Sequence, residues 1–205
     1  MDTENQDTYL TVSSKPASTE IKVKGSKFIG HVFHVLNKNQ AEAVYDNIRH
    51  KYHDASHNCF AYRISADEFR YADDGEPSGT GGKPIYHILE KTDLVQTIII
   101  VTRYFGGTKL GIGGLSRAYA ETADEVLKKT KIEMKTVYKT MTIETSYETL
   151  SHFLEILNRF QGIIGKTEYS DKITYCVQIP LSKSAYFLNE MKVFTGRGIK
   201  IVDEH

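Results

Sequence analysis

Apolar residues in the first part of the chain alternate between the spacing of strands and the spacing of helices. The stretch KFIGHVFHVL (27–36) predicts a strand, and a capping-box pattern at Asn37 and Gln40 then begins an amphipathic helix. Short strands are expected at 58–64 and 69–72, and IYHILEK predicts a short helix. The stretch LVQTIIIVTRY is apolar on both faces, which is typical of a central strand covered on both sides. A further helix is indicated by apolar residues at helical spacing: Leu115, Tyr119, Ala123 and Val126.

The last third of the chain carries a second pattern, which reads strand, helix, strand, strand, helix, strand. The first helix is expected to end with Gly162 at its C′ position, and Ser182 is expected to cap the second. The order βαββαβ is that of a ferredoxin-like unit. We therefore predict an α+β protein with two domains, at 19–133 and 136–205. The polar, turn-rich segment 1–18 before them is expected to be flexible and to lie loosely on the surface.

Composition narrows the class of protein. Of the 205 residues, 40% are hydrophobic, which is enough for a real core. Basic and acidic residues number 26 each, and this balance argues against a dedicated binder of duplex DNA but leaves room for a local cationic groove. The N-terminus lacks the features of a signal peptide, and the apolar runs are too short to span a membrane. We expect a cytoplasmic protein without a membrane partner, with Cys59 and Cys176 as reduced thiols in different domains.

Two glycine-rich segments of opposite charge hold most of the 15 glycines. The acidic loop, residues 72–84, reads ADDGEPSGTGGKP and places three acidic residues ahead of a single lysine. The cationic loop, residues 103–119, reads RYFGGTKLGIGGLSRAY and has arginine and lysine as its only charged residues. The sequence thus contains two glycine-rich loops of opposite charge.

Neither loop fits a nucleotide-binding motif. In the acidic loop, a P-loop ending at Gly82 and Lys83 would need glycine where Pro77 stands and a hydroxyl where Pro84 stands. In the cationic loop, Ser116 stands where a dinucleotide fingerprint has its last glycine. The chain also lacks a nucleophile elbow, and no serine is paired with an obvious base. The loops are therefore interpreted by their charge and backbone rather than by a motif.

The cationic loop indicates a site for an anion. The pair Gly113–Gly114 directly precedes a helix expected to begin near Leu115, and helix N-termini present unpaired amides and a positive dipole end. Arg117 falls in the first turn, where the dipole normally favours acids, and Lys109 and Arg103 approach the same loop in sequence. This group of cations needs a negative partner. Two candidates remain open: an outside ligand such as phosphate, or the acidic loop of the protein itself.

Metal chemistry is the weaker alternative. A metal-assisted hydrolase of a phosphorylated small molecule would use His57 as its base and three acidic side chains as ligands: Asp73, Asp74 and Glu76. Adjacent carboxylates in a turn are, however, usually solvated surface. The spacing H-x2-H-x3-H-x-C, which runs from His50 and His53 to Cys59, resembles a zinc site, but its members fall on different expected elements. We expect no metal, no cofactor and no catalytic residue.

Three long stretches resemble signature blocks of the YigZ/IMPACT family: SHNCFAYRI, DDGEPSGTGGKPI and VTRYFGGTKLGIGGLSRAYAETA. The resemblance covers nearly the whole chain and departs from the family at Phe60, where Trp is common, and at Gly81, where Ala is common. It implies a first domain similar to domain 2 of ribosomal protein S5 and a ferredoxin-like second domain similar to a module of elongation factor G.

The same resemblance bears on function. Eukaryotic members of the family regulate translation by binding the activator of a nutrient-sensing initiation-factor kinase, with the help of an additional RWD domain. The 205 residues leave no room for that domain, so we do not expect that partner here. For the bacterial branch, the resemblance implies a nucleic-acid or ribosome-linked role without an established reaction.

The leading hypothesis is a cytoplasmic binding or regulatory protein linked to translation, whose partner is RNA or a ribosomal component. Its contact surface is predicted to comprise eight residues of the cationic loop: Arg103, Tyr104, Gly106, Gly107, Lys109, Gly113, Gly114 and Arg117. Three residues of the acidic loop are expected to shape the neighbouring wall: Asp73, Asp74 and Glu76. The metal-assisted hydrolase with His57 as base, and a pure protein–protein adaptor, are the alternatives.

Overall fold

The computed structural model describes residues 7–204, which fall into two compact units. The first unit spans Leu10–Met134, and the second joins the chain from Lys135 onward with residues up to Tyr9. The division after Met134 lies close to the break that the sequence pattern predicts. Each unit mixes helices with strands and has its own sheet and apolar core, so the two are described separately.

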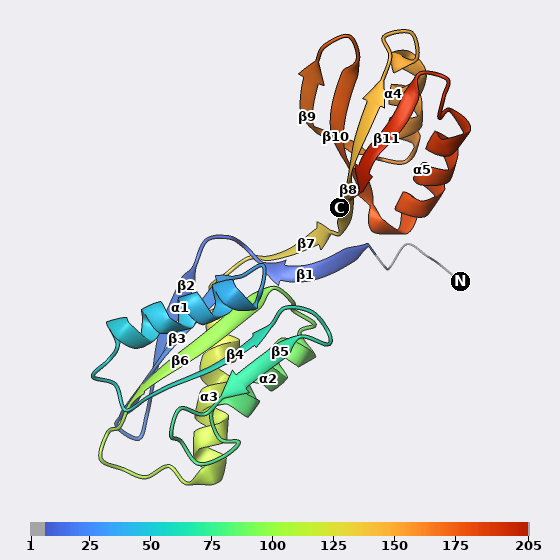
Figure 1. Ribbon diagram of the computed structural model, residues 1–205. Helices are drawn as coiled ribbons and strands as arrows, with labels where there is room; N and C mark the ends of the chain where they lie inside the picture. Colours follow the sequence, from blue (N-terminus) through green and yellow to red (C-terminus); the bar gives the residue numbers. More distant parts are fainter. Residues whose placement is uncertain (1–6, 205) are drawn as a thin grey trace. The chain divides into compact units, whose positions relative to one another are not determined.

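A five-stranded antiparallel sheet forms the frame of the first unit (Figure 1). The strand order is β2-β3-β6-β4-β5, which puts β6 in the middle. Every residue of β6 except the last is buried, as expected for a central strand whose two faces are both covered. The strands have these bounds: β2 Ala17–Val23, β3 Ser26–His34, β4 His57–Arg63, β5 Phe69–Ala72 and β6 Thr97–Tyr104.

Helices cover both faces of this sheet (Figure 1). α1 (Lys38–Lys51) packs on one face over Phe60 and Ile100, whereas α2 (Gly82–Lys91) and α3 (Ile112–Leu127) pack on the other. The two cores follow from the period-2 alternation of β6, because Ile98 and Ile100 face α1 while Ile99 and Val101 face α2 and α3. Both glycine-rich loops lead into helices of the same face.

The start of α1 follows the capping pattern read from the sequence, with one difference. Asn37 is the N-cap, and its Oδ1 accepts the amide of Gln40 at 3.0 Å. The side chain of Gln40 reaches back to the amide of Leu36, at 2.8 Å, rather than to that of Asn37. Asn37 therefore satisfies an amide that the helix leaves without an acceptor, and Gln40 satisfies the amide of the residue before the N-cap.

The N-terminal segment differs from the expectation of a loose surface segment. Residues 1–6 of the predicted segment 1–18 lie outside the described residues. Beyond them, Thr8–Val12 form β1, which pairs with β7 (Ile132–Thr136) in a two-stranded sheet. Thr11 and Val12 are buried, and Val12 belongs to the core of the first unit. Strand pairing thus fixes a stretch whose polar composition suggested otherwise.

The second unit is a four-stranded antiparallel sheet with the strand order β11-β8-β10-β9. Its two helices contribute Phe153, Leu157, Phe187 and Met191 to a core with the inward residues of the sheet. The alternation of β10 was read correctly, since Ile173, Tyr175, Val177 and Ile179 are all buried. The elements have these bounds: β8 Tyr138–Thr145, α4 Leu150–Arg159, β9 Ile163–Tyr169, β10 Ile173–Pro180, α5 Leu181–Val193 and β11 Ile199–Glu204.

Two expected helix caps of this unit were wrong in detail. The left-handed residue after α4 is Gln161, with φ 58°, and not Gly162. Gly162 follows it and donates its amide to the carbonyl of Leu157 at 2.8 Å, the long hydrogen bond of a Schellman motif. Ser182 lies in the first turn of α5, where its amide and hydroxyl both donate to the carboxylate of Asp7. An acidic residue far away in sequence therefore supplies the cap.

The placement of the two cysteines agrees with the sequence reading. Cys59 lies in β4 and Cys176 in β10, so the two free thiols belong to different units. Within the described part of the chain, no helix combines the length and the apolar character that crossing a membrane requires.

Candidate functional site

The acidic loop folds inward around the carboxylate of Asp73. Its Oδ1 accepts the amides of Gly81 and Gly82 at 2.9 and 2.8 Å, and its Oδ2 accepts the amide of Gly79 at 2.8 Å. Gly81 is the N-cap of α2 and has no side chain with which to cap it. Asp73 supplies the missing acceptor and puts a negative charge where the helix dipole favours one.

Asp74 ties the same loop to β4. Its carboxylate accepts the amide of Asn58 at 2.7 Å, and its carbonyl oxygen lies 2.8 Å from Nδ1 of His57. With Nδ1 donating to that carbonyl, Nε2 of His57 faces Oε1 of Glu76 at 3.9 Å. The turn itself needs left-handed backbone at Asp74 (φ 43°) and Gly75 (φ 86°), two residue types that tolerate it.

Glu76 forms a buried ion pair with Arg103 across the two loops. Nη1 of Arg103 donates to Oε1 of Glu76 at 2.6 Å, and the hydroxyl of Tyr119 donates to the same oxygen at 2.8 Å. Glu76 is 8% exposed and Arg103 is 5% exposed. Burial, assisted by the neighbouring Cys59 and Glu76, raises the pKa of the Tyr119 hydroxyl, which therefore remains a donor.

This ion pair shows which negative partner one cation of the loop has: Arg103 pairs with the acidic loop of the protein and not with an outside ligand. Arg103 is neutralised by the protein's own Glu76, so its burial removes it from the predicted phosphate-binding surface. Asp73 and Glu76 likewise point into the fold and do not form an exposed acidic wall. The two loops do contact each other, and this contact uses the innermost charge of each.

The residues of the metal alternatives do not converge. The three carboxylates of the acidic loop point at different partners, and Cys59 is buried with its thiol donating to the carbonyl of Asp73 at 3.0 Å. Nδ1 of His50 and of His53 each lies against a backbone carbonyl of α1. Across residues 7–204, no three His, Cys, Asp or Glu side chains are placed to share a metal ion.

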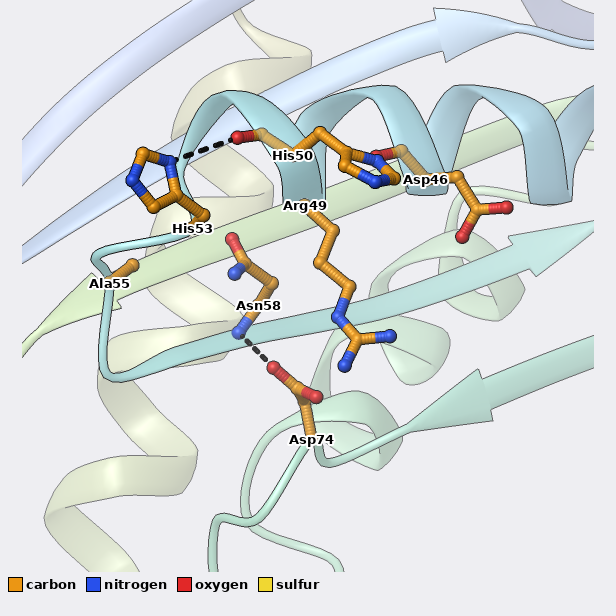
Figure 2. A pocket seen from close by; sticks show the side chains of 7 residues that line it. All are labelled: Asp46, Arg49, His50, His53, Ala55, Asn58 and Asp74. Atoms are coloured by element: carbon orange, nitrogen blue, oxygen red, sulfur yellow. Dashed lines mark hydrogen bonds between the residues drawn. The ribbon is translucent and has the colours of Figure 1, made fainter.

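A polar pocket of about 360 Å³ lies where α1 ends (Figure 2). Figure 2 shows Arg49 reaching from α1 toward Asp74, whose carboxylate already accepts the amide of Asn58. The lining of the pocket mixes acidic with basic side chains, so no single sign of charge dominates. Seven residues form it: Asp46, Arg49, His50, His53, Ala55, Asn58 and Asp74. This pocket does not select an anion in the way that an excess of cations would.

The cationic loop leaves β6 under tight backbone constraints. A Cβ at Gly106 would stand 1.9 Å from the carbonyl carbon of Gly25, so the loop and the β2–β3 turn touch backbone to backbone. The amide of Gly106 donates to Oγ of Ser26 at 3.2 Å. Gly107 and Gly111 have φ of 83° and 73°, which glycine adopts without steric cost.

α3 begins at Ile112, earlier than the predicted start near Leu115. Gly113 and Gly114 therefore lie inside the first turn, where amide groups have no acceptor within the helix. Crowding accounts for Gly114, because a Cβ there would approach that of Leu110 at 3.2 Å. At Gly113, by contrast, an added Cβ would meet no heavy atom of a described residue within 4 Å beyond its chain neighbours and the backbone of its own helix, and φ is not positive. The fold gives no reason for glycine at this position.

Lys109 and Arg117 are exposed on either side of this first turn. Neither forms an ion pair with any residue in the range 7–204. The cationic loop thus divides into an inner charge that the protein neutralises and two outer charges that face solvent. The outer pair, with the amides of α3, is the part of the predicted surface that remains open to an outside anion.

Tyr104 is less free than a stacking platform requires. Its hydroxyl donates to Asp54 at 2.7 Å, and the ammonium of Lys27 lies 4.6 Å from its ring centroid. The hydrogen bond to Asp54 raises the pKa of Tyr104 to about 12. One face of the ring is therefore occupied by a cation, and the hydroxyl has a fixed partner.

Comparison with known proteins places these loops in a family. The model of the Impact N-terminal domain matches residues 24–127, a range that contains both loops. The chain belongs to the IMPACT family. IMPACT family member YvyE of Bacillus subtilis is 34% identical over 82% of this chain and 77% of its own length, and IMPACT family member YigZ of Escherichia coli is 28% identical over 93% and 96%.

A solved structure resembles the whole chain as well. It is described as the crystal structure of a hypothetical protein, and it is 27% identical, with a TM-score of 0.69 over 96% of this chain and 97% of its own. The structural resemblance thus extends over residues of both units of this chain.

Sequence reasoning missed an apolar pocket beside the cationic loop of this IMPACT protein. The pocket measures about 370 Å³ and is lined by nine residues: Glu76, Pro77, Arg103, Phe105, Lys109, Leu110, Gly111, Ile112 and Leu115. Phe105 is 50% exposed and Ile112 is 72% exposed. The signal was present in the sequence, because Phe105, Leu110 and Ile112 stand beside or among the glycines of a loop that was interpreted by its charge and backbone.

Proposed function

We propose that this protein is a cytoplasmic binding or regulatory protein linked to translation, and that its cationic loop contacts RNA or a ribosomal component. Membership of the IMPACT family supports the link to translation, because the resemblance implies that role for eukaryotic members. The balanced total charge is compatible with a local contact of this kind, since two exposed cations need no basic excess elsewhere.

The single observation that carries the proposal is the unexplained glycine in the first turn of α3. Glycine in a helix costs up to about 1 kcal/mol relative to alanine, and nothing in the described fold requires it at Gly113. A missing side chain at a helix N-terminus lets a phosphate approach the amides closely. The exposed Lys109 and Arg117 would supply the charge for that phosphate.

The proposed contact surface is smaller than the predicted one. Lys109, Gly113, Gly114 and Arg117 would face the ligand, while Gly106 and Gly107 give the loop its path. Arg103 and Glu76 would support the loop from inside. Tyr104 would contribute at most one ring face, because Lys27 covers the other.

We also propose the finer fold assignments that the resemblance implies. The βαββαβ order of the second unit and its sheet order β11-β8-β10-β9 support a ferredoxin-like fold. The first unit would be similar to domain 2 of ribosomal protein S5, an assignment supported by the family resemblance.

The hydrolase alternative has lost its supporting geometry, because the acidic side chains that would bind the metal are engaged by amides and by Arg103. The adaptor alternative has gained an observation, namely the apolar pocket with exposed Phe105 and Ile112. A pull-down from lysate with and without nuclease separates an adaptor from an RNA-bridged contact, since only the latter is lost on digestion.

The proposal is tested by titrating labelled single-stranded RNA into the full chain at several salt concentrations. We expect micromolar binding. The logarithm of the association constant should fall linearly with the logarithm of the salt concentration, with a slope of about −0.7 per phosphate contact. The variant with Lys109→Ala and Arg117→Ala should bind weakly with a shallower slope. A control variant with Lys15→Ala and Lys38→Ala removes the same charge from other exposed sites of the first unit. Equal binding by wild type and the Lys109/Arg117 variant would overturn the proposal.

A further inference from the structure

The apolar pocket beside the cationic loop has a composition that the proposed phosphate contact does not use. Its walls come from Pro77, Phe105, Leu110, Ile112 and Leu115, side chains without hydrogen-bonding groups. Two of these side chains, Phe105 and Ile112, are half or more exposed. Exposed apolar residues that line a concave surface mark a contact site more often than residues scattered singly.

Charge around the pocket is unbalanced in favour of cations. Glu76, which lines the floor, already accepts from Arg103 and from Tyr119. Nε of Arg103 is buried and finds no acceptor among the described residues. Lys109 lines the rim without an ion-pair partner in the described chain, and the N-terminal end of α3 opens at Gly111 and Ile112. The occupant that complements this pocket is therefore apolar with a negative group beside it.

A nucleobase fits this lining poorly. The edge of a base carries donors and acceptors, and burying them against aliphatic side chains leaves them without partners. The polar atoms at the inner end of the pocket offer such an edge little, because Oε1 of Glu76 already accepts from Arg103 and Tyr119 and Nε of Arg103 has almost no accessible surface. An apolar side chain of a protein has no such edge. The observations therefore favour a protein segment over a nucleotide in this pocket.

We infer that the pocket formed by Phe105, Leu110, Ile112 and Leu115 binds a large apolar side chain of a partner protein, with a carboxylate of the same segment held by Lys109. The inference goes beyond the proposed contact with RNA phosphate, and it holds whether or not the amides at Gly113 bind RNA. Its occupant is a short acidic segment with one apolar anchor, the arrangement in which a buried anchor gives affinity and a rim charge gives orientation.

The test is an NMR titration of the full chain, with ¹³C-labelled methyl groups and ¹⁵N-labelled amides, against three small probes. N-acetyl-phenylalanine carries an aromatic ring and a carboxylate, its primary amide carries the ring alone, and uridine 5′-monophosphate carries a base and a phosphate. We expect millimolar binding of the acid that shifts the methyl signals of Leu110, Ile112 and Leu115. The amide should bind several-fold more weakly. The nucleotide should leave these methyl signals in place, whatever it does at the amide of Gly113.

Matched variants separate the pocket from the fold. Ile112→Ser removes an exposed wall of the pocket, and Leu36→Ser removes a side chain of similar exposure, 54%, elsewhere in the first unit. Lys109→Glu reverses the rim charge, and Lys15→Glu reverses an exposed charge away from the pocket. We expect Ile112→Ser to weaken binding of N-acetyl-phenylalanine about tenfold. Lys109→Glu should weaken binding of N-acetyl-phenylalanine but not of its amide. The two control variants should bind like the wild type.

Three results would overturn the inference. The methyl signals could stay unmoved up to the solubility limit of the acid and the amide. The nucleotide could shift them at lower concentration than the acid, which would assign the pocket to a base. The control variants could weaken binding as much as Ile112→Ser and Lys109→Glu, which would show nonspecific association. Loss of RNA binding in the Lys109→Ala, Arg117→Ala variant, without any effect of the probes, would leave the proposed function standing and this inference refuted.

Discussion

The acidic and cationic loops are both rich in glycine and charged residues, but they differ in whether the protein itself supplies partners for those charges. In the acidic loop, Asp73, Asp74 and Glu76 all accept hydrogen bonds from the protein itself. In the cationic loop, Arg103 is paired inward, whereas Lys109 and Arg117 stay in solvent without an ion-pair partner among residues 7–204. The acidic side chains therefore stabilise the fold, whereas the two outer cations are available to bind a ligand. The charge of a residue in a glycine-rich loop therefore does not reveal whether its side chain turns into the fold or toward solvent.

The two loops also contain glycines that differ in what an added Cβ would meet. A Cβ at Gly81 would stand 2.4 Å from Sγ of Cys59, and one at Gly82 would stand 2.6 Å from the backbone of Ala72. Those glycines are required by crowding. A Cβ at Gly113 would meet no described atom within 4 Å beyond its chain neighbours and its own helix backbone, and φ there is not positive, so neither crowding nor backbone conformation requires glycine. Crowding also accounts for Gly106 and Gly114 in the cationic loop, so Gly113 is the glycine that packing and backbone conformation leave unexplained.

The largest expected effect comes from breaking the ion pair that joins the loops. Glu76→Gln should lower the free energy of unfolding by about 3 kcal/mol, because the charge of Arg103 then stays buried without a counter-charge. Chemical denaturation measures this loss. The double variant Glu76→Leu with Arg103→Met should cost less than Glu76→Gln, since it buries no unpaired charge.

Glu125→Gln is the matched control for this prediction, because it removes an exposed ion-pair partner of Lys128 on α3. It should leave stability unchanged. If Glu76→Gln were as mild as Glu125→Gln, the inner contact between the loops would not hold the fold together, and the contrast between a closed and an open loop would fail.

A smaller loss is expected at Asp73, whose carboxylate accepts three amides. Asp73→Ala should cost about 2 kcal/mol, because it leaves the amides of Gly79, Gly81 and Gly82 without their acceptor. Asp73→Asn should cost less, since its remaining oxygen still accepts the amides that begin α2. Hydrogen exchange should quicken at these three amides and not at the first turn of α3. Exchange that quickens equally in both loops would mean that Asp73 does not act locally.

Much of the fold followed from local patterns in the sequence. The central strand β6 was predictable because Ile98–Val101 is β-branched and apolar on both faces. The second unit was predictable because β10 alternates with strict period 2. The errors arose where a distant residue supplied the contact: Asp7 caps α5, and β7 fixes β1. Such partners are far apart in the chain, so no local pattern announces them.

The candidate site was predicted only in part, for a similar reason. The sequence singled out residues of both loops by their charge and glycine content. Which of those charges turn inward depends on the packing of β6 against α3, which places Arg103 and Tyr119 around Glu76. The apolar pocket was not predicted, because the loop was interpreted by its charge and backbone and no local pattern shows that Phe105 and Ile112 are exposed. Whether an apolar residue in a loop is buried is a tertiary property.

The smallest expected effect is the most discriminating one, because it has the opposite sign. Gly113→Ala should raise the free energy of unfolding by about 0.5 kcal/mol, since alanine fits the helical backbone and meets no described neighbour within 4 Å. Gly107→Ala should lower it by about 1 kcal/mol, because φ there is 83°. If Gly113 is kept for a ligand, its alanine variant should be more stable and yet bind labelled single-stranded RNA more weakly than the wild type. A variant that is more stable and binds equally well would show that the first turn of α3 is open but unused. One that is less stable would show that the fold, after all, needs this glycine.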